Sequence, residues 1–268
     1  MSSFAPNVKV CEDISHISSA ARDIILAAID ARVDKSTPVV LALSGGSTPK
    51  RLYEELHEKD LALLQQHAVQ FILGDERLVA TDDEQSNFSM ATKALLRDVP
   101  SSDVIAIDPS AALATSKDEK GGIDGAWVVA QDYEMKLRNG IPCTQVNGTD
   151  MPVPVVDIML LGFGADGHTA SIFPDSVAAT DEDHIVSVSF PSPTMNPKVW
   201  RVTLSKTVIQ NAKHVVVLAC GKDKNWVVHG VLAEAPSGPL PVSRFLRDCR
   251  GSVTMLLDAG SGEGLSAK

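Results

Sequence analysis

The chain has 268 residues, of which 44% are apolar and 22% are charged, and these ordinary globular values exclude a collagen-like, disordered or disulfide-dense protein. The 24 Lys and Arg residues against 34 Asp and Glu residues give a formal net charge of -10, so we expect neither a nucleic acid nor an anionic membrane as a partner. No apolar run approaches the roughly 20 residues that span a bilayer, and the first residues lack the apolar stretch of a secretory signal. We therefore expect a cytoplasmic protein with free cysteines, as a monomer or a weak homo-oligomer.

Short β-branched runs alternate along the chain with segments of helical periodicity. The runs predict buried strands because each is too short for a helix. This alternation predicts an α/β fold with a mostly parallel sheet flanked by helices on both faces. The predicted strands are residues 39–43, 69–73, 155–161, 199–204, 214–220 and 252–257, and the predicted helices are residues 14–31, 49–66, 87–96, 125–138 and 223–233.

Two polar segments interrupt this alternation, at residues 109–124 and 140–154. Both contain the Gly, Pro and polar residues that are typical of surface loops. Neither is long enough or linker-like enough to require a domain boundary, so we expect a single domain over residues 1–268.

The first candidate site follows the strand at residues 39–43, where the sequence SGGST leads into a helix predicted to begin at Pro49. Two glycines let backbone N–H groups approach a ligand, the hydroxyls can donate to it, and a helix N-terminus favours an anion. The motif GxxxxGK[ST] is absent, so a monophosphate fits better than a nucleoside triphosphate. A plain tight turn with Thr48 as the helix N-cap is an equally open interpretation. This SGGST loop consists of Ser44, Gly45, Gly46, Ser47 and Thr48.

A second candidate site follows the strand at residues 69–73, where Asp75, Glu76 and Arg77 place three charges at a strand end. Such charges form either a structural ion-pair cluster or a set of acid, base and anion-binding groups in a cleft. From these residues alone, the structural interpretation is the favoured one.

The third candidate site follows the strand that ends at Leu161, where a glycine-rich segment delivers Asp166 and His168. The segment also fits GxGxxG, so a nicotinamide-dinucleotide enzyme is the alternative hypothesis. Asp166 would oppose a pyrophosphate there, and Pro174 would stop the following helix after about two turns. We therefore favour an imidazole, His168, that acts as a base near neutral pH beside a carboxylate.

The fourth candidate site follows the strand at residues 214–220, where Lys222 and Lys224 stand at the start of a helix. A lysine at a helix N-terminus is favourable when an anion joins it, although a solvated lysine pair is the common alternative. Arg201 and Arg244 are further candidate anion-binding residues.

Together these motifs resemble the glucosamine-6-phosphate isomerase/6-phosphogluconolactonase family, and within it the lactonase branch. The resemblance implies a Rossmann-like sheet and the hydrolysis of 6-phospho-D-glucono-1,5-lactone in the pentose phosphate pathway, with no metal and no cofactor. It extends in the family's order over residues 41–246. The motifs that carry it are SGGSTP, GDER with QSNFSMA, GFGADGHTASIFP, RVTLS with a later GxxK, and PVSR.

The resemblance also implies roles for single residues. It places the substrate phosphate on the SGGST loop, with Arg77, Lys224 and Arg201 as cationic partners. Lys222 competes with Lys224 for this assignment. It makes His168 the general base that activates water.

In the same resemblance, Asp75 and Asp166 lie beside the reacting centre, with their division of roles left open. The deaminase branch carries an acid five positions after its histidine, where this chain has Phe173. An apolar ring cannot carry a proton, so the lactonase is preferred over the amino-sugar isomerase. A regulator that senses a sugar phosphate would share the SGGST loop, but it would not need Asp75, Asp166 and His168 together.

Overall fold

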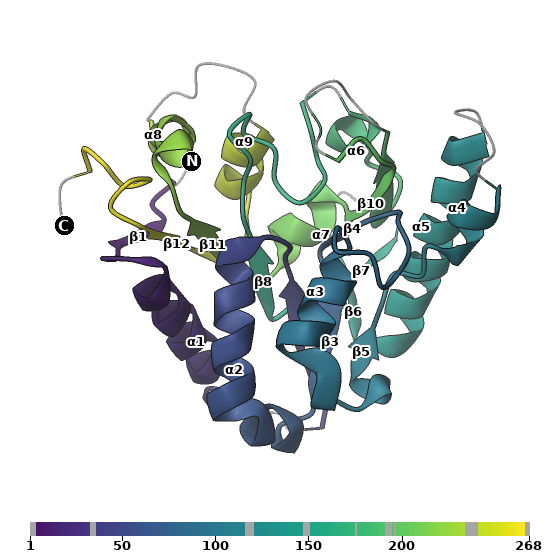
Figure 1. Cartoon of the computed structure of the whole chain (residues 1–268), viewed down its shortest axis with the longest axis horizontal. Helices are drawn as coiled ribbons and strands as arrows, with labels where there is room; N and C mark the ends of the chain where they lie inside the picture. The colour runs from purple at the N-terminus through teal and green to yellow at the C-terminus, as the bar shows by residue number, and fades with distance from the viewer. Residues whose placement is uncertain are drawn as a thin grey trace.

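A seven-stranded parallel sheet forms the centre of the computed structural model within the described part of the chain (Figure 1). Its order is β1-β12-β11-β8-β2-β3-β5. The described residues are 4–32, 36–115, 121–146, 151–174, 176–190, 195, 197–233 and 241–265. The strands are β1 (Asn7–Val10), β2 (Val39–Leu43), β3 (Val69–Leu73), β5 (Val104–Ile105), β8 (Ile158–Leu161), β11 (His214–Ala219) and β12 (Ser252–Leu257).

Helices flank this sheet, and α1, α2 and α3 pack side by side (Figure 1). The continuous burial of β2 and β8 explains their apolar, β-branched sequences, since helices leave neither face of a parallel sheet to solvent. The predicted α/β class is therefore confirmed. The helices are α1 (Ile14–Asp30), α2 (Ser47–Gln66), α3 (Asn87–Ala94), α4 (Ser110–Thr115), α5 (Gly121–Gly140), α6 (Val177–Thr180), α7 (Lys206–Asn211), α8 (Asn225–Leu232) and α9 (Pro241–Arg247), with 3-10 turns η1 (Leu96–Asp98), η2 (Ser101–Asp103) and η3 (Lys222–Lys224).

Two segments predicted as surface loops contain regular secondary structure. The segment 109–124 is not a loop throughout, because α4 occupies Ser110–Thr115 and α5 begins at Gly121. The alanine-rich sequence of α4 has a helix propensity that outweighs its short length. Similarly, the predicted loop 140–154 contains the antiparallel pair β6 (Cys143–Gln145) and β7 (Pro152–Pro154), with residues 147–150 outside the described residues.

A second, antiparallel sheet of order β4-β10-β9 lies beyond the carboxyl end of β3. β4 follows β3 after Gly74 alone, and the Leu204 N–H donates to the Gly74 carbonyl at 2.8 Å. The predicted strand at residues 199–204 is confirmed, but it belongs to this sheet and not to the central one. The bounds are β4 (Asp75–Arg77), β9 (Val186–Ser189) and β10 (Arg201–Leu204).

The direction of chain travel across the central sheet reverses between β2 and β8. From β2 the chain proceeds outward to β3 and β5, and it then returns to β8 on the other side of β2 before continuing to β11 and β12. In open parallel sheets, ligands bind at the carboxyl ends of strands where such a reversal occurs. The ends of β2, β3, β8 and β11 therefore mark the place to look for a site.

Cys11, Cys143, Cys220 and Cys249 are all free. Among the described residues, no helix has the length and apolar character that a membrane crossing requires.

Candidate active site

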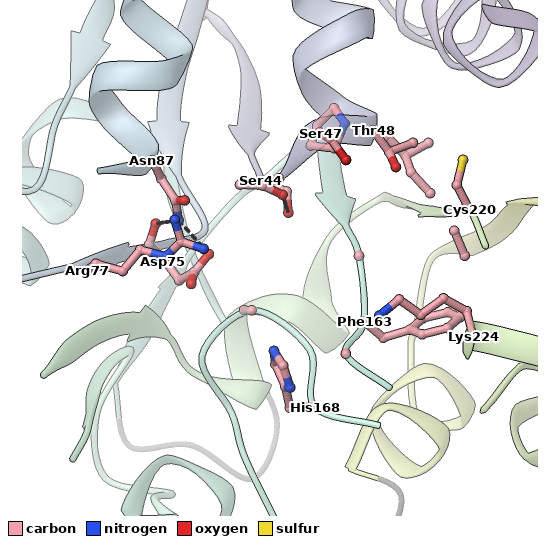
Figure 2. A pocket seen from close by; sticks show the side chains of 18 of the residues that line it. Ser44, Ser47, Thr48, Asp75, Arg77, Asn87, Phe163, His168, Cys220 and Lys224 are labelled. Carbon is pink, nitrogen blue, oxygen red and sulfur yellow. Dashed lines mark hydrogen bonds between the residues drawn. The ribbon is translucent and has the colours of Figure 1, made fainter. Parts of the chain in front are cut away.

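A cavity of about 370 Å³ opens at the carboxyl ends of β2, β3, β8 and β11 (Figure 2). Figure 2 shows Arg77, Asp75 and Asn87 on one side of the cavity, Thr48 and Lys224 on the other, and His168 below them. All four predicted strand-end sites contribute to it. The predicted residues that line it are Ser44, Gly45, Gly46, Ser47, Thr48, Asp75, Arg77, His168, Arg201 and Lys224.

The SGGST loop is held by a buried tyrosine. Tyr53 of α2 donates its hydroxyl hydrogen to the Ser44 carbonyl and accepts from the Ser44 N–H, both at 2.8 Å. Burial raises the pKa of this phenol, so it remains a donor at every physiological pH. Gly46 has a φ of +108°, which favours glycine, and it forms the N-cap of α2. The helix therefore begins at Ser47, and the expectations of a start at Pro49 and an N-cap at Thr48 are wrong.

Gly45 has no side chain because Asn87 occupies the space beside it. A Cβ at Gly45 would lie 2.0 Å from Oδ1 of Asn87. Asn87 Nδ2 donates to the Asp75 carbonyl at 3.0 Å and to its Oδ1 at 3.3 Å, and the Ser171 hydroxyl donates to Asp75 Oδ2 at 2.6 Å. The Asp75 carboxylate is therefore fixed from two directions at the wall of the cavity.

Glu76, the next residue, has a structural role. Its buried carboxylate accepts from the N–H groups of Asn87 and Phe88 at 2.8 and 2.7 Å and from the Ser86 hydroxyl at 2.9 Å. These donors belong to the N-terminus of α3, whose free N–H groups need acceptors. Burial raises the pKa of Glu76, and the same hydrogen bonds oppose the rise. Glu76 thus attaches α3, and with it Asn87, to β4.

Two arginines face each other across β4 and β10. Arg77 and Arg201 are directly opposite in the antiparallel register, so their side chains leave the same face of the sheet. Burial and the nearby Arg77 lower the pKa of Arg201, while Asp75 opposes them. Arg77 donates from Nη1 to the Gln85 carbonyl at 2.7 Å, but its buried Nε has no partner among the described residues. A like-charged pair of this kind is unfavourable unless an anion joins it.

His168 lies on the loop after β8, in contact with Asp166. Its ring Nδ1 is 2.5 Å from Oδ1 of Asp166, and its backbone N–H donates to the same oxygen at 3.2 Å. Burial raises the pKa of Asp166, but its hydrogen bonds and charge interaction with His168 outweigh burial and leave the pKa below its ordinary value. An ionised Asp166 accepts the Nδ1 hydrogen, which leaves the Nε2 lone pair free to take a proton.

The two candidate lysines lie in different environments. Lys224 lines the cavity, its side chain is 23% exposed, and Nζ is 3.1 Å from Oδ2 of Asp223. The Lys222 side chain is 79% exposed and pairs with Glu263 at 3.0 Å, away from the cavity lining. The geometry therefore favours Lys224.

Asp166 does not share the place of Asp75 at the cavity wall. It contacts His168 but is not among the residues that line the cavity, because its carboxylate lies beside Nδ1. Arg244 also lies elsewhere, in a surface hollow with Lys206 and Asp248. No group of three or more potential metal-ligating side chains occurs within the described ranges.

The glycine-rich segment after β8 forms turns, and not the helix that a dinucleotide site requires. Gly164 N–H donates to the His168 carbonyl at 2.8 Å, Gly167 N–H donates to the Gly164 carbonyl at 3.0 Å, and the next helix, α6, begins at Val177. Sequence analysis did not assign a role to Asn87, although QSNFSMA was a visible signal. It also missed the contacts of Phe173 and the place of Cys220 in the cavity wall.

The fold and cavity define an α/β protein with a cavity at the reversal point of its sheet that is lined by cationic side chains. The family model for "Glucosamine-6-phosphate isomerases/6-phosphogluconolactonase" matches residues 12–255. The chain belongs to this family.

Several similar proteins are described as 6-phosphogluconolactonases. The crystal structure of 6-phosphogluconolactonase from Leishmania guyanensis has a TM-score of 0.94 and 83% identity, and the match covers 98% of this chain and 100% of that one. The structure of 6-phosphogluconolactonase from Trypanosoma brucei has a TM-score of 0.91 and 43% identity over 98% of this chain and 100% of that one. The 6-phosphogluconolactonase of Nostoc sp. is 31% identical over 97% of this chain and 98% of its own length.

Proposed function

We propose that this protein hydrolyses 6-phospho-D-glucono-1,5-lactone to 6-phosphogluconate. Its similarity to several 6-phosphogluconolactonases over nearly their whole length supports the choice of reaction. The observation that carries the proposal is the single cavity that combines a carboxylate-supported imidazole with three cationic side chains. A neutral lactone ring with a distant phosphate needs a base at one end of its site and cations at the other.

The phosphate binds to the SGGST loop and to the cations around it. The N–H groups at the start of α2 point towards an anion, and Ser47 and Thr48 add hydroxyl donors. Lys224, Arg77 and Arg201 supply positive charge at the cavity wall. Binding the phosphate restricts the lactone to one pose, which orients the reacting carbonyl without contact to the bond that breaks.

His168 provides the acid–base chemistry. Nε2 accepts a proton from water as the water oxygen bonds to C1 of the lactone. The C1–ring oxygen bond then breaks with its electron pair moving to the ring oxygen, and the imidazolium returns the proton to that oxygen. No step uses a metal or a cofactor. The ionised Asp166 stabilises the imidazolium between these steps and fixes its tautomer.

Asp75 has a different role from Asp166 in this proposal. Asn87 and Ser171 hold its carboxylate at the cavity wall, while Asp166 reaches only His168. An acceptor in that place orients the attacking water or a sugar hydroxyl. Phe173 occupies the position where the deaminase branch has an acid, so the ring-opening chemistry of that branch lacks its proton carrier here.

The test compares three substrates on the purified protein. Acid release is followed in a pH-stat with 6-phosphogluconolactone and with unphosphorylated gluconolactone, and ammonia release is followed with glucosamine 6-phosphate, each beside an enzyme-free control. We expect fast hydrolysis of the phosphorylated lactone alone. Loss of two or three contacts worth ~1.5–3 kcal/mol each costs the unphosphorylated lactone several orders of magnitude in kcat/KM.

Each other outcome contradicts a named part of the proposal. Equal rates on the two lactones would remove the phosphate site, and catalytic ammonia release would move the protein to the deaminase branch. Binding of phosphorylated lactone without turnover would favour the sensing regulator.

A further inference from the structure

The ring of Phe173 connects His168 with Arg201. Its centroid is 4.2 Å from the centroid of the His168 imidazole, and the two rings stack with an angle of 27° between their planes. The guanidinium carbon of Arg201 lies over the same ring, 5.5 Å from its centroid. Phe173 is 3% exposed and still lines the active-site cavity. The mechanism above gives this ring no task beyond excluding an acid.

The loop between β8 and α6 is built so that Phe173 turns back onto His168. Ala170 has a φ of +48°, in the left-handed region, and the Ile172 N–H donates to the Thr169 carbonyl at 2.9 Å. The Ser176 hydroxyl donates to the Phe173 carbonyl at 2.8 Å. A reversal of the chain between the two residues thus brings the rings together, and hydrogen bonds hold it at both ends.

The stacking completes a set of contacts around the imidazole. Asp166 fixes one edge through Nδ1. At Gly164, a Cβ would lie 2.2 Å from both Nδ1 and Cε1, so the imidazole packs directly on the glycine backbone. Phe173 covers a face of the ring. A hydrogen bond to Nδ1 alone permits the ring to swing about that bond, whereas a stacked face prevents it.

We propose that Phe173 is a positioning residue that holds the imidazole of His168 with Nε2 directed at the attacking water. The inference rests on the proposed function. It gives Phe173 a function of its own, which is to hold the His168 ring, besides occupying the position where the deaminase branch has an acid. Proton transfer requires heavy atoms within hydrogen-bond reach, so a ring that swings spends only part of its time in the productive geometry.

The Phe173 ring also contacts two groups, His168 and Arg201, that would repel each other when both are cations. When Nε2 takes the proton from water, His168 becomes a cation near the guanidinium of Arg201. A cation against an aromatic face within about 6 Å is attracted to it. This attraction arises only after proton transfer, so it acts on kcat and not on substrate binding. An aliphatic side chain of similar volume would fill the space but provide no such face.

The experiment compares Phe173→Leu, Phe173→Tyr and Phe71→Leu with the wild type. Phe71→Leu is the matched control, because Phe71 is a buried ring of β3 that does not line the cavity. Thermal melting establishes the folded fraction of each variant. We expect Phe173→Leu to lower kcat on 6-phosphogluconolactone by roughly 10- to 100-fold with KM within about threefold of wild type. Phe173→Tyr keeps the aromatic face and recovers most of kcat, and Phe71→Leu loses stability only.

A second measurement does not depend on turnover. In protein labelled with ¹³C at the histidine rings, ring relaxation gives an order parameter for the His168 imidazole, which a His168→Gln sample identifies. We expect this order parameter to fall in Phe173→Leu and to stay at the wild-type value in Phe173→Tyr and Phe71→Leu. This readout remains decisive if the protein hydrolyses no lactone at all, so failure of the proposed function is distinguishable from failure of this inference.

Three results would overturn the inference. The first is an unchanged order parameter in Phe173→Leu. When the wild type hydrolyses the lactone, the second is a kcat for folded Phe173→Leu equal to that of Phe71→Leu, and the third is a loss that appears in KM alone. If Phe173→Tyr does not fold at the assay temperature, Phe173→Trp supplies the aromatic face in its place.

Discussion

Gly164 is the position at which one added methyl group tests the geometry of the base. In Gly164→Ala, the new Cβ would lie 2.2 Å from Nδ1 and Cε1 of His168 and 2.5 Å from Oδ1 of Asp166. Contacts shorter than 3.0 Å essentially never occur for a real Cβ, so the imidazole must retreat by about 0.8 Å or more. The backbone itself is not strained, because Gly164 is not among the glycines with a positive φ.

The size of the effect follows from that displacement. A misplacement of about 1 Å can cost roughly 10²-fold in rate, which corresponds to about 2.7 kcal/mol of activation free energy. We therefore expect kcat of Gly164→Ala to fall by roughly 10²-fold. KM should change little, since the SGGST loop and the cations of the proposed phosphate site lie on other elements.

The assay is pH-stat hydrolysis of 6-phosphogluconolactone, with the spontaneous rate subtracted. The control is Gly162→Ala in the same loop, where a Cβ would meet only the Leu218 carbonyl at an ordinary 3.7 Å. Both Gly→Ala substitutions lower the conformational entropy of the unfolded chain by a similar amount. This effect on stability therefore cancels when the two variants are compared. Equal kcat values for the two variants would refute the packing of His168 on Gly164.

Four further outcomes follow from the site. His168→Ala should lower kcat by roughly 10²–10⁴-fold with KM nearly unchanged, and a near-wild-type kcat would remove His168 as the base. Lys224→Ala should raise KM more than Lys222→Ala, since Lys222 is exposed and paired with Glu263, and the reverse order would exchange the two lysines. In Asp166→Asn, a neutral hydrogen bond replaces a charged one, which costs about 1–1.5 kcal/mol, or roughly 5- to 15-fold in kcat. Because the pKa of Asp166 is lowered, its carboxylate stays ionised above the ordinary value of 3.8 and loses its effect only as pH falls through the lowered pKa. On the high-pH plateau of activity that both proteins reach, the kcat ratio should therefore be constant, and a ratio that varies on that plateau would contradict an ionised Asp166. Exhaustive chelation with EDTA should leave the rate unchanged, and loss of activity that a divalent ion restores would contradict a base that acts without metal.

The sequence predicts the five inner strands of the central sheet because they are buried on both faces, and it misses the edge strands β1 and β5, which are partly or fully exposed. Burial on both faces requires unbroken apolar runs, and the VVLAL of β2 and the HVVVLA of β11 are such runs. Two strands of the second sheet, β4 and β9, escape prediction for the opposite reason. β4 consists of Asp75, Glu76 and Arg77, and β9 alternates valine with buried serines at positions 187 and 189, so neither shows an unbroken apolar run.

The candidate site is predicted as a set of residues, but their relations are not. Motifs at strand ends indicate which side chains gather at one edge of a sheet. Whether Asp166 faces the cavity or only His168 depends on turns within one loop. The stacking of Phe173 on His168 and the contact of Asn87 with Asp75 depend on long-range packing. A list of motif residues contains no such information.

Because of the opposed arginines of β4 and β10, the free energy of unfolding should depend on the concentration of an anionic ligand. Arg77 and Arg201 repel each other across the register, and Asp75 offsets part of this repulsion; an anion bound beside the pair would offset more of it in the native state only. A ligand at 100 times its Kd adds about 2.7 kcal/mol to the free energy of unfolding. Phosphate or sulfate in a storage buffer would therefore protect the protein while competing with its substrate, and the melting temperature would depend on the anion present. In a cell, the protein would be hardest to unfold, and hardest to degrade, when its substrate is abundant.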